Sequence, residues 1–233
     1  MSQRIEALPW DSDFFDLSIG QVDLNGADPN VLDEIVIEAR DRKFDCVYGS
    51  HEPADTYTSL HAQDAGFRLV EINQLMKRPP GPFATPPTRS VVRTATEDDL
   101  HLISDSLDTL APWSRFGADP RFGTTAARRL HSAWVHRAVT DPERLATISE
   151  DEDGIDGVGT HVWGEQPRID LLGVIRPGTG AAWQHIAKLI EWADGGEVLG
   201  GPCAARNIAP LRFLEHCGFA LTRVTYTHHW WAT

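Results

Sequence analysis

A proline-rich segment divides the chain into two unequal parts. From Arg78 to Thr88 the sequence reads Arg-Pro-Pro-Gly-Pro-Phe-Ala-Thr-Pro-Pro-Thr, with five prolines in eleven residues. Proline fixes φ and has no amide hydrogen, so this run cannot continue a helix or a central strand. The sequence therefore predicts a truncated N-terminal lobe over residues 1–78, a semi-rigid linker over 79–89 and a second domain over 90–233.

The two parts share an order of elements. In each, a strand is followed by an Asx residue and, eleven residues later, by a glycine: Asp55 and Gly66 in the first part, Asn207 and Gly218 in the second. Asn and Asp accept the free N–H groups at a helix start, and glycine adopts the left-handed conformation after a helix end. Any β-α-β unit would show this order, but the matched spacing favours a shared architecture.

The charge balance limits the partners. The chain has 21 Lys and Arg against 34 Asp and Glu, a net charge of −13, and no run of basic residues. Phosphate-backbone binding needs clustered cations, so we expect neither nucleic acid nor an anionic membrane as a partner. We expect a cytoplasmic protein with free thiols, because the sequence has no signal-like start, no span of about 20 apolar residues and only three dispersed cysteines.

Beyond the linker, the residue patterns predict alternating strands and helices. The order favours an α/β fold with a mixed, partly antiparallel sheet flanked by helices. The expected elements are a strand at 90–93, a helix at 97–110 capped by Thr96, an aromatic loop at 112–123, a helix at 125–139, a hairpin of 145–150 and 158–164, a strand at 169–174, a helix at 181–193, a strand from Val198, a helix from Asn207 and a strand to about Trp230.

The stretch most informative about chemistry runs from Ile169 to Trp183, where a buried strand enters a glycine-rich turn that opens a helix. Such a turn can present several backbone N–H groups to an anion, with the helix dipole behind them. Gly178 and Gly180 would let a ligand approach the backbone. The turn is neither a P-loop nor a complete dinucleotide fingerprint, and a plain structural turn is an equally good interpretation of the motif alone.

In context, this region resembles the Gcn5-related N-acetyltransferase (GNAT) superfamily over roughly residues 90–230. The resemblance is carried by Val92–Leu100, by the strand end Leu172-Gly-Val174, by the turn and by Asn207–Phe219. The family's turn usually reads Gln/Arg-x-x-Gly-x-Gly/Ala, whereas here Pro177 stands in the first position and the turn is about two residues short.

A narrower resemblance covers nearly the whole chain and is to the TDP-fucosamine acetyltransferase group, whose members carry such a truncated first lobe. Leu8–Phe15, the half-domain around Gly66-Phe67, the segment Ser114–Phe122 and the next helix with Trp134 carry it. It implies transfer of an acetyl group from acetyl-CoA to a small-molecule amine such as a nucleotide-linked amino sugar, with a homodimer left open.

The resemblance also assigns residues to the acyl-CoA site. It places the N–H of Val174 at the oxyanion, the pantetheine along Leu172 to Val174, and the pyrophosphate on the turn. Asn207 matches a CoA-contacting Asn of the family, although a simple helix cap is an equally good reading. The implied set is Leu172, Val174, Gly178, Thr179, Gly180, Ala181, Ala182 and Asn207.

Two residues are candidates for the general base. Asp170 lies four residues before Val174, an offset at which several family members keep a carboxylate, but a surface or ion-paired aspartate would look the same. His161, in the preceding strand, has a suitable ordinary pKa of about 6.5, although a lone strand histidine is more often structural.

The general acid departs from the family. Its helix usually reads Arg-Phe-Tyr-Glu, and here Leu214 stands in place of the tyrosine. Tyr226 or a water could donate the proton instead. The alternatives are another acyl-CoA reaction on the same fold, such as decarboxylation or hydrolysis, or a non-catalytic acyl-CoA-binding protein.

The aromatic loop is the candidate acceptor site. Ser114, Arg115, Phe116 and Arg121 would bind the acceptor, the arginines gripping a phosphate or carboxylate. The alternative is a loop packed down by its aromatic residues, with the arginines paired to nearby aspartates. We expect no metal site, because His228 and His229 are adjacent on a strand and face opposite ways. Cys203, in the strand beside the expected thioester path, could be a nucleophile, but we expect a buried apolar thiol.

Overall fold

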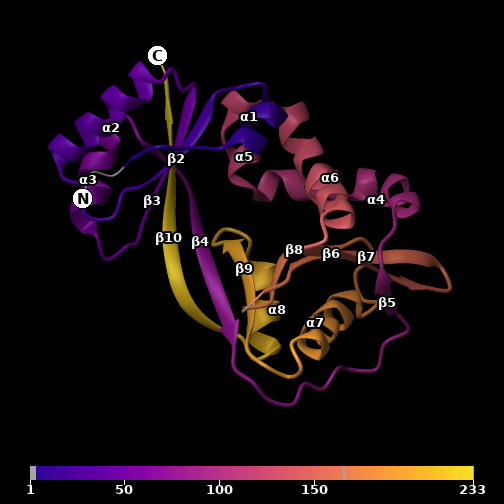
Figure 1. The fold of residues 1–233 in the computed structure, drawn as a ribbon. Helices are drawn as coiled ribbons and strands as arrows, with labels where there is room; N and C mark the ends of the chain where they lie inside the picture. The colour runs from indigo at the N-terminus through magenta and orange to yellow at the C-terminus, as the bar shows by residue number, and fades with distance from the viewer. Residues whose placement is uncertain (1–3, 165, 233) are drawn as a thin grey trace. The chain divides into compact units, whose positions relative to one another are not determined.

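The computed structural model describes residues 4–164 and 166–232, which form two compact units (Figure 1). One unit contains the chain up to Asn73 together with the residues from Arg223, and the other contains Gln74–Thr222. The expected division into 1–78, 79–89 and 90–233 differs from these units in two respects. The boundary falls inside a strand, and the end of the chain belongs to the first unit because it pairs there with an early strand.

The first unit is a small mixed sheet with helices. Hydrogen bonding orders its strands β1-β2-β3-β10-β4. β1 is antiparallel to β2, β2 is parallel to β3, and β10 is antiparallel to β3 with Tyr226 opposite His51. Its elements are β1 (Glu6–Ala7), α1 (Pro9–Phe15), β2 (Ile19–Asp23), α2 (Pro29–Asp41), β3 (Cys46–His51), α3 (Thr56–Asp64), the start of β4 (Arg68–Arg78) and the end of β10 (Ala220–Trp231).

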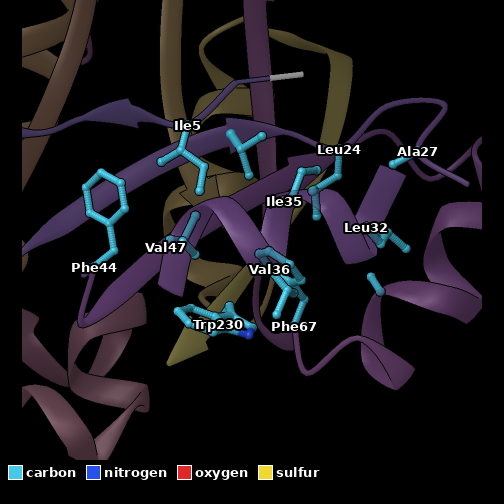
Figure 2. Close-up of a cluster of buried hydrophobic side chains, with 13 residues drawn as sticks. Ile5, Leu24, Ala27, Leu32, Ile35, Val36, Phe44, Val47, Phe67 and Trp230 are labelled. Atoms are coloured by element: carbon cyan, nitrogen blue, oxygen red, sulfur yellow. The ribbon is translucent and has the colours of Figure 1, made fainter. Parts of the chain in front are cut away.

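Helix α2 supplies one side of this unit's core (Figure 2). Asp28 caps the helix by accepting from the N–H of Val31 at 2.9 Å. The buried side chains of α2 recur every three or four residues, the spacing of one helix face. They pack with Val47 of β3, Trp230 of β10 and Phe67, which directly precedes β4. The α2 set is Leu32, Ile35, Val36 and Ala39.

The second unit contains the elements expected beyond the proline-rich segment. Its strands are ordered β4-β9-β8-β7-β6-β5, antiparallel from β5 to β8 and parallel between β8 and β9. They are β5 (Val91–Thr94), β6 (Arg144–Asp151), β7 (Gly154–Val162), β8 (Arg168–Val174) and β9 (Val198–Ala204), with the end of β4 and the start of β10. The α-helices are α4 (Leu100–Leu107), α5 (Arg115–Ala118), α6 (Thr124–Thr140), α7 (Ala181–Trp192) and α8 (Ile208–His216). The mixed, partly antiparallel α/β fold predicted from the sequence is confirmed.

Helices cover the sheet of the second unit from two sides (Figure 1). One core joins α4 and α6 to β6 and β7 through Ile103, Leu107, Val135 and Ile148. The other joins α7 and α8 to β8 and β9, with Ile186 and Leu189 as its most buried helix residues. None of the described helices is long and apolar enough to cross a membrane.

The segment expected to be an aromatic loop at 112–123 consists of short helical turns instead. They are η2 (Asp108–Trp113), α5 and η3 (Pro120–Phe122). Ser114 caps α5 by accepting from the N–H of Gly117 at 3.1 Å, and Asp119 accepts from the N–H of Arg121 at 3.2 Å. These side chains satisfy free N–H groups at the starts of the two short helical turns.

Candidate acyl-donor site

Strands β8 and β9 pair over only a short distance. Their parallel ladder joins Arg168 to Leu199 and Ile169 to Gly200, and no further pair is recorded among the described residues, although β8 continues to Val174. Beyond this point Val174 is 44% exposed. The two strands therefore stop pairing before Leu172–Val174, the segment that the resemblance assigns to the thioester arm.

The glycine-rich turn after β8 presents unsatisfied donors. Gly178 and Gly180 have φ values of +87° and +91°, which side chains rarely adopt, and Gly180 caps α7. Within the described part of the chain, the N–H groups of Gly178, Gly180 and Ala182 make no hydrogen bond. N–H groups without an intramolecular acceptor near a helix start are donors that can bind an anion without a lysine. This suits a chain with a net charge of −13.

Asn207 has a side chain available for a ligand. It stands at the N-cap of α8, yet its side chain makes no capping hydrogen bond. Asp55, at the same place in the first unit, accepts from the N–H of Thr58 at 3.0 Å, the hydroxyl of Thr58 at 2.6 Å and the N–H of Gly26 at 2.6 Å. The structure therefore does not support the interpretation of Asn207 as a simple side-chain cap, and its amide is left for contact with a ligand.

Asp170 is an ion-paired residue. Its two carboxylate oxygens accept from Arg168 at 2.6 Å and from Arg144 at 3.0 Å. The register between β7 and β8 shifts at this residue, since Thr160 lies opposite Leu171 while His161 lies opposite Ile169. A bulge interrupts the alternation of side chains, so the offset of four residues no longer places Asp170 on the face of Val174. The ion-pair alternative fits this arrangement better than a general base.

His161 is buried in a neutral environment. It is 1% exposed, and its Nε2 lies 3.0 Å from the hydroxyl of Thr147, which also lies 3.0 Å from Nδ1 of His185. Burial, with a smaller contribution from His185, lowers the pKa of His161 to about 3. An imidazole with so low a pKa is a weak base near neutral pH, and the structural reading of His161 fits better.

Leu214, which replaces the family's acid, and Tyr226, the candidate substitute, lie in different surroundings. Leu214 is 3% exposed in the core of the second unit, and a Cβ on Gly200 would be 3.0 Å from its Cδ1. Its position is therefore part of the packing of α8 on β9. Tyr226 belongs to the first unit, where its ring meets His51 edge to face at 5.5 Å between centroids.

The candidate acceptor segment is mostly packed down. Phe116 is 3% exposed and meets Phe122 edge to face at 5.1 Å. Arg121 grips Asp119 through two bonds of 2.9 and 3.0 Å, and the guanidinium of Arg115 lies over the ring of Phe116 at 4.7 Å. The packed and ion-paired alternative is what the structure shows for these residues.

Two contacts still place this segment near the donor site. The carbonyl of Ser114 accepts from Arg206 at 2.8 Å, and Arg206 directly precedes Asn207. A Cβ on Gly173 would lie 3.4 Å from Cδ1 of Leu110, so η2 packs over the end of β8. Trp113, which is 45% exposed, follows in the same turn. The sequence analysis did not identify Arg206, because no sequence pattern distinguishes an arginine that bonds the carbonyl of Ser114 from any other exposed arginine.

The remaining chemical candidates are structural. Burial raises the pKa of the Cys203 thiol to about 11, which disfavours a thiolate nucleophile. His228 stacks on His51 at 5.1 Å, and its pKa falls to about 4 through burial and the two neighbouring histidines. Among residues 4–164 and 166–232, no group of three or more His, Cys, Asp or Glu side chains could hold a metal ion.

Comparison with known proteins connects this geometry to a fold. No protein-family model and no curated protein matches the chain. Among solved structures, a functionally unknown conserved protein from Staphylococcus epidermidis aligns with a TM-score of 0.70 at 12% identity, over 93% of this chain and 85% of that one.

Two further structures carry a stated activity class. A GCN5-related N-acetyltransferase from Sphaerobacter thermophilus aligns with a TM-score of 0.59 at 17% identity, over 97% of this chain and 75% of that one. A tandem GNAT protein from the clavulanic acid biosynthesis pathway gives 0.56 at 12% identity, over 92% and 75%. The chain therefore has the fold of these GCN5-related N-acetyltransferases.

Proposed function

We propose that the protein is an acyl-CoA-dependent N-acyltransferase that moves an acetyl group from acetyl-CoA to the amine of a small molecule. The free N–H groups in the turn before α7, which follows the strand that stops pairing with β9 after Ile169, are the observation that carries this proposal. They are the chemistry that a pyrophosphate requires. The fold shared with N-acetyltransferases supports the reaction class.

The residues divide the binding of the donor among them. The N–H groups of Gly178, Gly180 and Ala182 would hold the pyrophosphate, and the amide of Asn207 would contact the pantetheine arm. Leu172 and Val174 would line the path of the thioester, with a backbone N–H at Val174 for the oxyanion. Thr179 and Ala181 belong to the same turn, where Ala181 is buried against the sheet.

The reaction needs little acid catalysis from the chain. The neutral amine attacks the thioester carbonyl, the C–S bond breaks, the amine loses its proton to solvent, and coenzyme A leaves as the thiolate. A thiol with an ordinary pKa of about 8.5 is a good leaving group. Because Asp170 is ion-paired and His161 is buried, we propose that water, rather than either side chain, takes the proton.

For the acceptor we propose an amino sugar, such as a nucleotide-linked one. Trp113 is exposed on the segment that Arg206 braces next to Asn207, and an aromatic side chain there would stack on a sugar or base. The pairing of Arg121 with Asp119 leaves phosphate recognition to other groups.

A thiol-release assay with acetyl-CoA and a panel of amines tests the reaction, and calorimetry with coenzyme A tests the donor site. Asn207→Ala should weaken coenzyme A binding about five-fold, the worth of one net hydrogen bond. Asn30→Ala, at an exposed position on α2, is the matched control and should change nothing. Silence across the amine panel together with no binding heat would refute the proposal.

The lack of a hydroxyl at Leu214 supports two alternatives, another acyl-CoA reaction or acyl-CoA binding without a reaction. With no hydroxyl at the position of the family's acid, the protein would bind acyl-CoA but run a decarboxylation or hydrolysis, or no reaction. Mass spectrometry of acetyl-CoA and malonyl-CoA incubated without an amine separates these cases. Product without an acceptor supports the alternative enzyme, and coenzyme A binding without any product supports a binding protein.

A further inference from the structure

The proline-rich segment ends in contact with the glycine-rich turn. The hydroxyl of Thr88 donates to the carbonyl of Thr179 at 2.6 Å. The hydroxyl oxygen of Thr88 in turn accepts from the N–H of Ser90 at 3.0 Å. Upstream, Phe83 stacks on Trp183 of α7 with ring centroids 5.9 Å apart. The segment therefore contacts α7 through Phe83 and the turn before α7 through Thr88.

The held carbonyl fixes the orientation of a donor. In a trans peptide the C=O of one residue and the N–H of the next point in opposite directions. Thr88 holds the carbonyl of Thr179, so the N–H of Gly180 is directed away from Thr88. A Cβ on Gly180 would lie only 2.5 Å from Oγ1 of Thr88, which shows how closely the segment covers this side of the turn. The N–H of Gly180 therefore points to the opposite side, where it has no acceptor within the described ranges.

Asp156 of β7 bonds both Ser90, beside Thr88, and the backbone at the start of the glycine-rich turn. Its side chain is fully buried, and it accepts from the hydroxyls of Ser90 and of Ser149, the latter at 2.5 Å. Its backbone carbonyl accepts from the N–H groups of Ile175 and Arg176 at 2.9 and 3.1 Å, at the entry to the turn. A buried carboxylate is costly without donors, so Ser90 and Ser149 must face it.

Thr88 carries the main bond to the turn. Ser90 also lies 3.2 Å from the carbonyl of Thr179, but a serine hydroxyl has a single proton. That proton goes to the Asp156 carboxylate, which is the nearer and charged acceptor. The carbonyl of Thr179 therefore depends on the hydroxyl of Thr88.

We infer that Thr88 and Asp156 are positioning residues for the acyl-donor site, and that residues 83–90 form part of this site by orienting the Thr179–Gly180 peptide toward the donor's pyrophosphate. This inference rests on the proposed function. Thr88 acts through the turn and touches no reacting atom. Its removal should affect binding of the donor and leave the chemical step and the acceptor unchanged.

The test compares three variants of the full chain. Thr88→Val keeps the shape and removes the hydroxyl, Thr88→Ser keeps the hydroxyl, and Thr222→Val is the matched control because Thr222 donates to the carbonyl of Leu75 at 3.1 Å. Thr88→Ala replaces the valine variant if that variant does not fold. Calorimetry measures the Kd for coenzyme A, and steady-state assays measure both KM values and kcat.

We expect Thr88→Val to raise the Kd for coenzyme A and the KM for acetyl-CoA by roughly 5- to 10-fold, with kcat and the acceptor KM unchanged. Thr88→Ser should restore wild-type binding, and Thr222→Val should retain it. A wild-type protein that binds no coenzyme A overturns the proposed function and this inference with it. A wild type that binds and a Thr88→Val variant that binds equally well overturn this inference alone.

Discussion

Replacing Gly180 by alanine separates two physical costs that the turn imposes. The first is backbone strain, because Gly180 has a φ of +91°. A left-handed conformation costs a non-glycine residue about 1–2 kcal/mol, partly offset by about 0.4–1 kcal/mol from a less disordered unfolded chain. The second is the overlap of the new Cβ with Thr88, at 2.5 Å from its Oγ1 and 2.7 Å from its Cβ.

Gly178 provides the matched control. Its φ of +87° is nearly the same, but a Cβ there would meet nothing within 4 Å. We expect Gly178→Ala to lower the free energy of unfolding by about 1 kcal/mol, from strain alone. Gly180→Ala should lower it by about 2–4 kcal/mol, because displacing a stiff threonine adds about 1–3 kcal/mol.

Urea unfolding of Gly178→Ala, Gly180→Ala, Thr88→Ala and the double variant Gly180→Ala/Thr88→Ala measures this difference, with unchanged m values as a condition. Removing the Thr88 side chain beyond Cβ should relieve part of the overlap, so the double variant should be more stable than the sum of the single changes predicts. Equal losses for Gly178→Ala and Gly180→Ala, or strict additivity in the double variant, would refute the reasoning.

Four further outcomes follow from the site. Asn207→Ala should change the free energy of unfolding by less than about 0.5 kcal/mol, because its side chain makes no cap, and differential scanning calorimetry checks this. The folded pKa of His161, about 3, lies below its unfolded value of about 6.5, so the unfolded state binds the proton first as the pH falls. The contribution of His161 to the free energy of unfolding, which is present above pH 6.5, should fall by about 2 kcal/mol between about pH 7 and 5. A His161→Asn variant whose free energy of unfolding changes with pH as much as that of the wild type would contradict this. Asp170→Asn should change kcat less than about threefold, whereas a general base would cost roughly 100-fold or more. Leu214→Tyr should destabilise the protein by about 1–3 kcal/mol through overpacking, without raising kcat; a gain in kcat would show that the position faces the thioester.

The order of helices and strands was predictable because it follows from the spacing of apolar residues and from turn residues that are close together in the sequence. The helix at Ala181–Trp192 follows from apolar residues at helical spacing, and the hairpin of β6 and β7 from its Asp-Gly turn. The boundary between the two units could not be predicted, because it depends on the pairing of β10 with β3, which are separated by more than half of the chain. No local signal records such a contact.

The site shows the same division between local and long-range information. The glycine-rich turn and Asn207 could be found from the sequence, since glycine and Asx residues mark special backbone positions. The side of the sheet on which Asp170 lies could not be predicted, because one bulge residue in β8 breaks the alternation of side chains on which the prediction relied. The role of Thr88 depends on a bond to a residue 91 positions away.

The path of β10 also sets the order in which the chain can become structured during synthesis. The unit that carries the glycine-rich turn is continuous from Gln74 to Thr222, and all its residues emerge from the ribosome before Arg223. The first unit begins earlier but lacks the strand that pairs with β3 until the residues from Tyr226 to Trp231 are made. Domains commonly fold from the N-terminus onward as synthesis proceeds. Here the later-encoded unit is complete first, and the N-terminal strands must wait, with β3 offering an unpaired edge, until the last strand arrives.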